Sequence, residues 1–250
     1  MTRLLRLDLR ECETMALSLP EDAERRASVE TICQRLGLSF HTLDAIRCQP
    51  GRIGCGLSHL RALRLSKPNV PLLILEDDVG VSDAFTPMIE IPDDADALYL
   101  GGSVYGAVDI VDYVGFTGML AADVVSNDLV RVYNLLGTHA ILYLTERFKL
   151  ATAEQILRSM VDRDWAHDKG MAVLQESHNV YALTRPPFFQ AAGLQAPGHG
   201  AHQESVTRVR LEALPAGALA TLGIGDEWRP AVLVRDAGVL RWRWASGDEA

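Results

Sequence analysis

The chain has 250 residues, of which 48% are hydrophobic and 23% charged, a profile that predicts a globular protein with one large domain, with or without a small appendage. Its formal net charge of -9 argues against a nucleic-acid-binding protein, because neutralising phosphates requires clustered lysines and arginines, and gives no overall attraction to an anionic membrane. The four cysteines form no Cys-x-x-Cys pair, so neither a zinc ribbon nor a redox motif is indicated. Four cysteines in a chain of this length fit a reduced, cytosolic setting.

The N-terminal segment is interrupted by charged residues and lacks the apolar core of a signal peptide. No stretch approaches the roughly 20 apolar residues that span a bilayer. We therefore expect a cytoplasmic protein with no transmembrane segment. Its membrane contact would be peripheral, through a lipid-linked substrate at the inner face.

The first third of the chain alternates between apolar stretches and helical patterns. Strands are expected over residues 15–19, 40–43 and 71–75. Helices are expected over residues 20–36 and 57–65, and a glycine-rich turn over residues 51–56. The run 71–75 is continuously apolar, as in a central strand that is buried on both faces. This order favours β-α-β units, a partly parallel sheet and the α/β class.

The remainder of the chain adds further strands and one clear helix. Strands are expected over residues 97–100, 138–144 and 179–183, and a capping box at Thr152 predicts a helix to about Val161. Near the C-terminus, residues 231–234 and 239–244 flank a turn and predict a β-hairpin. The expected fold is a mixed sheet flanked by helices, with a small C-terminal β-hairpin extension.

Three acids, Glu76, Asp77 and Asp78, directly follow the predicted central strand. Adjacent carboxylates are costly to bury unless a cation or hydrogen-bond donors compensate them. They would lie at the carboxyl end of the strand, the edge at which open α/β sheets bind ligands. Mg²⁺ and Mn²⁺ favour carboxylate and phosphate oxygens, so the pattern suggests a metal and diphosphate site. A solvated loop after the strand is an equally good interpretation of the local pattern.

The surrounding residues resemble those of glycosyltransferase family 25, the lipopolysaccharide-biosynthesis and collagen-galactosyltransferase type. Residues 53–59 read Ile-Gly-Cys-Gly-Leu-Ser-His, and about fifteen residues later 73–79 read Leu-Ile-Leu-Glu-Asp-Asp-Val, in the family's order. Leu17 to Pro20, Asp168 and the segment 186–190 also match in order. The resemblance covers roughly residues 15 to 195, and residues 205–250 match nothing in the family.

The resemblance implies a GT-A-type catalytic domain over 1–204, with 205–250 as an extension. It implies transfer of a hexose from a UDP-sugar to a hydroxyl acceptor, with inversion and with Mn²⁺ or Mg²⁺ as cofactor. Asp77 and Asp78 would be the metal ligands. The other residues expected around the donor and its diphosphate are Leu17, Leu19, Arg25, Asp44, Ala45, Ser58, His59, Glu76 and Gln190.

Several of these roles have structural alternatives. Core packing is at least as good a role for Leu17 and Leu19, and Arg26 competes with Arg25 as the arginine that reaches the diphosphate. Cys55 is interpreted as a small buried residue, because no base accompanies it in the sequence.

An inverting transferase needs a base for the acceptor hydroxyl. The resemblance implies Asp168 in this role, and Asp164, four residues earlier, could share a helix face with it. His139 and His167 are weaker alternatives.

Two other functions remain open from the sequence. A nucleotidyl- or phosphotransferase could use the same acids, but the chain has no P-loop. A catalytically degenerate GT-A scaffold could act as a sugar- or partner-binding module. The donor sugar, the acceptor and the oligomeric state do not follow from the sequence.

Overall fold

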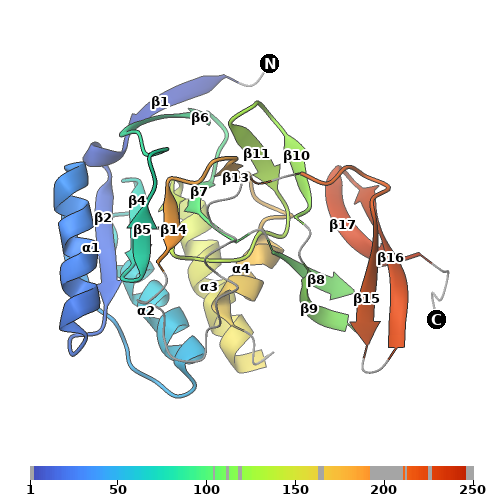
Figure 1. Cartoon of the computed structure of the whole chain (residues 1–250), viewed down its shortest axis with the longest axis horizontal. Helices are drawn as coiled ribbons and strands as arrows, with labels where there is room; N and C mark the ends of the chain where they lie inside the picture. The colour runs from blue at the N-terminus through green and yellow to red at the C-terminus, as the bar shows by residue number, and fades with distance from the viewer. Residues whose placement is uncertain are drawn as a thin grey trace.

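A computed structural model of the chain describes residues 3–103, 105–110, 113–117, 120–162, 166–191, 211, 213–224 and 227–245. The fold is mixed α/β, with a large sheet flanked by helices and a separate small sheet near the C-terminus (Figure 1). This confirms the fold class expected from the sequence. Within these residues no helix combines the length and apolar character needed to cross a membrane.

The large sheet has eight strands and mixed direction. In spatial order they are β10 (Ala122–Val124), β11 (Leu129–Val132), β13 (Val180–Leu183), β7 (Ala97–Gly101), β12 (Ala140–Tyr143), β4 (Leu72–Glu76), β2 (Glu13–Ser18) and β3 (Phe40–Asp44). The strands β3, β2 and β4 run parallel, whereas β12 is antiparallel to both of its neighbours, β4 and β7. The apolar runs recognised in the sequence are these central strands, whose residues are almost all buried.

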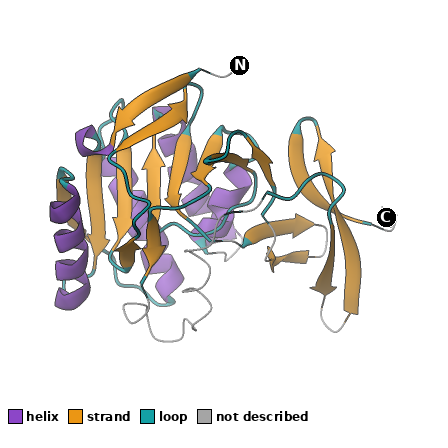
Figure 2. Ribbon diagram, turned by 45° about the horizontal axis from the view of Figure 1, so that its top comes forward, coloured by secondary structure: helices purple, strands orange, loops and turns teal. Residues whose placement is uncertain are grey.

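The helices cover the two faces of this sheet unequally (Figure 2). The elements are η1 (Leu9–Glu11), α1 (Ala23–Leu36), α2 (Gly51–Leu65), α3 (Glu146–Asp162) and α4 (His167–Leu174). Leu73 and Leu75 of β4 join a core cluster with α1, whereas Leu72 and Ile74 join a second cluster with α2, α3 and α4. Since successive side chains of a strand point to opposite faces, residue parity along β4 decides which helices a side chain meets.

Two helices begin earlier than the sequence suggested. The stretch 51–56, expected as a glycine-rich turn, forms the first turns of α2. A Cβ on Gly54 would lie 2.3 Å from the carbonyl oxygen of Ile46, so close packing accounts for this glycine. Thr152, expected to cap a helix, lies fully buried inside α3, which begins six residues earlier at Glu146. The capping-box interpretation is therefore wrong.

Two short antiparallel pairs flank the large sheet. One joins β1 (Leu4–Asp8) to β6 (Met88–Pro92), and the other joins β5 (Val79–Val81) to β14 (Phe188–Gln190). The second pair places Gln190 opposite Val79, immediately after the acidic triplet. A segment more than 100 residues downstream thus reaches the carboxyl end of β4.

The C-terminal residues form a three-stranded antiparallel sheet of β15 (Leu219–Ile224), β16 (Glu227–Asp236) and β17 (Val239–Trp244). The expected hairpin is confirmed as β16–β17, with a turn at Ala237-Gly238 where both φ angles are positive. This sheet packs with β8 (Gly106–Ile110), which pairs with β9 (Tyr113–Thr117), through a third core cluster that includes Val108 and Trp242. Trp242 is therefore a core residue.

Candidate functional site

The acidic triplet is divided by the alternation of the strand that precedes it. Glu76, in phase with Leu72 and Ile74, points to the face that carries α2 and α4. Asp77 points to the opposite face, where its carboxylate meets Arg25 of α1. The three acids therefore serve two neighbouring clusters and not one.

The first cluster is a carboxylate pair held by one arginine and one amide. Asp77 and Asp78 are each 6% exposed. The guanidinium of Arg25 forms an ion pair with Asp77 and lies 3.5 Å from Asp78 Oδ2. Gln190 Nε2 donates to the same Asp78 oxygen at 3.3 Å. The other oxygen, Asp78 Oδ1, is buried and has no hydrogen-bond partner among the described residues.

Burial and neighbouring charge disfavour the ionised form of this pair. Burial and the negative charge of Glu76 raise the pKa of Asp78 from 3.8 to about 7, against the opposing effect of Arg25. Burial also raises the pKa of Asp77, although a hydrogen bond from Ser18 and the charge of Arg25 act against it. A cation beside Asp78 Oδ1 would favour the ionised form of both carboxylates and so lower both pKa values.

The pair fits a hard divalent cation. Its carboxylate oxygens are the ligands that Mg²⁺ and Mn²⁺ prefer, and the unpartnered Asp78 Oδ1 is the atom that such a cation would satisfy. The Arg25 guanidinium already neutralises part of the pair, so a cation at Asp77 would have to share that carboxylate with it.

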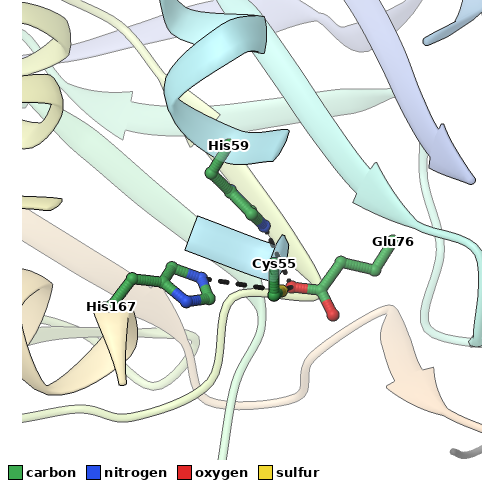
Figure 3. A group of neighbouring side chains, drawn as sticks. All are labelled: Cys55, His59, Glu76 and His167. Carbon is green, nitrogen blue, oxygen red and sulfur yellow. Dashed lines mark hydrogen bonds and ion pairs between the residues drawn. The ribbon is translucent and has the colours of Figure 1, made fainter. Parts of the chain in front are cut away.

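The second cluster surrounds Glu76 on the other face of the sheet (Figure 3). His59 Nε2 lies 3.0 Å from Glu76 Oε1, and the hydroxyl of Thr138 donates to the same oxygen at 2.6 Å. Thr138 Oγ1 is also 3.0 Å from His167 Nε2. Cys55 Sγ lies 3.9 Å from Glu76 Oε1 and 4.0 Å from His167 Nε2.

The protonation states in this second cluster follow from its burial and hydrogen bonds. Burial alone would raise the pKa of Glu76, but hydrogen bonds from His59 and Thr138 hold it well below its usual value. Burial lowers the pKa of His167 to about 3, so this imidazole is neutral at pH 7. Burial and the charge of Glu76 raise the pKa of the Cys55 thiol.

Asp168 stands at the start of α4, next to His167. Its Oδ1 accepts a hydrogen bond from the backbone of Lys169 at 2.8 Å, and the backbone of Gly137 is a second donor. Burial nevertheless raises the pKa of Asp168, and Glu76 adds to this effect, which places the two acids in one electrostatic neighbourhood. Its role as the base stays a prediction.

The other donor-site residues expected from the sequence lie in two kinds of environment. Leu17 is a core residue, as its alternative role required, and Leu19 is partly exposed at the end of β2. Asp44, mostly exposed, pairs with Arg26, and the Ala45 amide donates to the Ser18 carbonyl.

Ser58 has a structural role that its two hydrogen bonds define. Its hydroxyl accepts from the backbone of Ile46 at 2.8 Å and donates to the Gly54 carbonyl at 2.7 Å. These two hydrogen bonds hold the loop before α2 against the helix. Asp164 lies outside the described residues.

Three members of the second cluster, Cys55, Thr138 and His167, have a place in the site that their sequence context does not predict. From the sequence, Cys55 is expected as a small buried residue, His167 as a weaker alternative base, and Thr138 only as the start of a strand. Cys55 and His59 are four residues apart in α2 and share a helix face, which was the available signal. His167 and Thr138 come from distant segments, so only the fold brings them there.

Comparisons with known proteins do not identify a family. No protein-family model matches the sequence, and no curated protein matches it. One solved structure, a nucleoside-diphosphate-sugar pyrophosphorylase from Vibrio cholerae RC9, aligns over 73% of this chain and 78% of its own, with 12% identity and a TM-score of 0.38. Another, a glycosyltransferase involved in the glycosylation of the major capsid of PBCV-1, aligns over 69% and 93%, with 9% identity and a TM-score of 0.30. At these scores neither likeness carries an argument about activity.

Proposed function

We propose that this chain is a glycosyltransferase that moves a hexose from a UDP-sugar to a hydroxyl acceptor, with Mn²⁺ or Mg²⁺ held by Asp77 and Asp78. The acceptor class is a saccharide, a lipid-linked glycan or a peptide. Residues 1–204 would form the catalytic domain and 205–250 an extension. The observation that carries the proposal is the buried carboxylate pair after β4, with one oxygen lacking any partner among the described residues.

The cost of that pair supports a ligand-binding role. Two carboxylates that are 6% exposed, beside a third acid, oppose folding unless a cation compensates them. Arg25 supplies one positive charge for two negative ones. The negative charge that Arg25 leaves uncompensated would attract a divalent cation. The bound cation would in turn neutralise the departing nucleoside diphosphate.

The chain's own residues have separable roles in this proposal. Arg25 and Gln190 orient the carboxylates, and the guanidinium can also fork onto a phosphate. Asp168 accepts the proton of the acceptor hydroxyl as the sugar is attacked. A pKa raised by burial suits a carboxylate to this task, because a base works best when its pKa approaches the working pH.

The proposal is tested by thermal unfolding with UDP- and GDP-sugars, with and without Mn²⁺. A ligand at about 100 times its Kd adds about 2.7 kcal/mol, which raises Tm by about 5 to 11 °C in a chain of this size. We expect a shift with one UDP-sugar that requires Mn²⁺ and disappears in Asp78→Asn. The matched control is Asp83→Asn, which removes the same charge from an exposed position five residues away and should keep the shift.

A second candidate function is a degenerate scaffold that binds a sugar or a partner without catalysis. It is favoured by the ion pair between Arg25 and Asp77, since an internal cation can replace a metal. In that case no nucleotide-sugar would shift Tm at millimolar concentration, and Mn²⁺ would bind wild type and Asp78→Asn equally. Release of UDP that requires both Mn²⁺ and an acceptor would exclude the scaffold.

A further inference from the structure

The second cluster brings together four side chains that can each ligate a metal. Cys55 and His59 come from adjacent turns of α2, Glu76 from the end of β4, and His167 from the start of α4 (Figure 3). One donor atom from each lies within 4.8 Å of every other. Side chains from three separate elements therefore bring four possible metal ligands together.

The spacing of these atoms is close to that of a tetrahedral site. Zinc bonds of 2.0 to 2.3 Å place neighbouring ligand atoms about 3.3 to 3.6 Å apart. The measured separations include 3.0 Å from His59 to Glu76, 3.9 Å from Cys55 to Glu76, and 4.0 Å from Cys55 to His167. Movements of about 1 Å or less would bring the four atoms around one ion.

Charge and ligand softness point to zinc. One thiolate and one carboxylate balance Zn²⁺, and two neutral imidazoles add no charge, so the occupied site is neutral, which suits two buried imidazoles beside a partly buried thiol and carboxylate. A thiolate and two imidazoles favour Zn²⁺ over Mg²⁺ or Mn²⁺. The carboxylates of Asp77 and Asp78, on the other face, have the opposite preference.

The two imidazoles turn their Nε2 atoms toward this cluster. His59 Nε2 lies 3.0 Å from Glu76 Oε1, His167 Nε2 lies 3.0 Å from Thr138 Oγ1, and the two buried rings have centroids 4.8 Å apart. Packing two imidazoles and a thiol around one carboxylate is costly without a compensating ion.

We propose that Cys55, His59, Glu76 and His167 bind a structural Zn²⁺ that ties α2, β4 and α4 together. Four protein ligands close the coordination sphere, so the ion stabilises the fold and does not activate water. This proposal does not depend on the glycosyltransferase activity. It is distinct from the Mn²⁺ or Mg²⁺ site, which uses Asp77 and Asp78.

The test is the metal content of the full chain, purified without a histidine tag after growth with added zinc. We expect about one Zn²⁺ per chain by elemental analysis, and the visible bands of tetrahedral, thiolate-bound cobalt after exchange with Co²⁺. Cys55→Ser should weaken zinc binding by at least about 100-fold, because losing a ligand costs more than losing an outer partner. The control Cys48→Ser removes a thiol from the loop before α2 and should bind zinc normally.

Other outcomes separate the alternatives. Asp78→Asn should keep its zinc, even if the nucleotide-sugar shift is lost. Wild type that contains no zinc and takes none up in a chelator-competition titration would refute the site, as would equal zinc binding by Cys55→Ser. If Cys55→Ser fails to fold, the cobalt spectrum of wild type decides, because octahedral bands without thiolate character would also overturn the assignment.

Discussion

The substitution Asp78→Asn tests whether the carboxylate pair costs stability in the absence of a cation. The pKa of Asp78 is about 7 in the folded chain, against 3.8 for the ordinary carboxyl group. The folded state therefore binds more protons between these values, so stability falls as pH rises from about 4 to 7. One pKa unit corresponds to about 1.4 kcal/mol, which gives an upper limit of about 4 kcal/mol for the loss, and we expect about 2 to 4. Asparagine has nearly the same shape and does not titrate.

The assay is urea unfolding of both proteins in EDTA between pH 4 and pH 8. Other acids titrate in both proteins, so the difference between variant and wild type isolates most of the Asp78 contribution. We expect Asp78→Asn to gain stability relative to wild type from about pH 4 to pH 7, and the difference to level off above pH 7. Asp83→Asn, at an exposed position, should show a difference that stays flat within about 0.5 kcal/mol. A flat difference for Asp78→Asn would refute the idea that burial raises this pKa.

Three further predictions concern the helix packing, the Glu76 cluster and the proposed base. In urea unfolding, Gly54→Ala should cost more than about 2 kcal/mol, because the added Cβ would lie 2.3 Å from the Ile46 carbonyl oxygen. Gly51→Ala in the same helix is the control: its added Cβ would meet no neighbouring atom within 4 Å, so the variant should be neutral or slightly stabilising. Thr138→Val should cost about 1.5 to 3 kcal/mol in the same assay, since it removes a hydroxyl that donates to the partly buried Glu76 carboxylate. Asp168→Asn should lower kcat for sugar transfer by about 10² to 10⁴ and leave the donor-induced Tm shift unchanged.

The central strands could be predicted because a strand buried on both faces is a continuous run of apolar residues. The runs 71–75 and 97–100 are continuously apolar, and they form β4 and β7 in the middle of the sheet. The strands β10 and β11, at one edge of the sheet, contain no continuous apolar run of this length. β10 has only one buried residue, Ala122, and the buried residues of β11 are interrupted by Arg131. The place of the pair in the sheet depends on pairing of β11 with β13, a contact between distant segments.

The start of α2 could not be predicted from local propensity. Glycines are common in turns, so residues 51–56 suggested one. In the fold, Gly54 allows the backbone of the preceding loop to approach, and a Cβ on Gly56 would lie 3.2 Å from the side chains of both His167 and Met160. Their small size is a requirement of tertiary packing, which a single sequence does not reveal.

The candidate site was predictable in composition but not in arrangement. The strand-end position of Asp77 and Asp78 and the approach of Gln190 agree with the sequence analysis. The separation of Glu76 from its two neighbours follows from strand parity, which the identities of the residues do not show. His167 joins Glu76 only because α4 packs against α2.

The two clusters on opposite faces of β4 are coupled through electrostatics. The negative charge of Glu76 is one of the causes that raise the pKa of Asp78. A cation that neutralises Glu76 from the side of α2 therefore makes Asp78 easier to ionise, and an ionised Asp78 is a better ligand for a second cation on the side of α1. If both proposed ions bind, the end of β4 would hold a soft-ligand site at Glu76 and a hard-ligand site at Asp77 and Asp78, and neutralising Glu76 would lower the electrostatic cost of ionising Asp78.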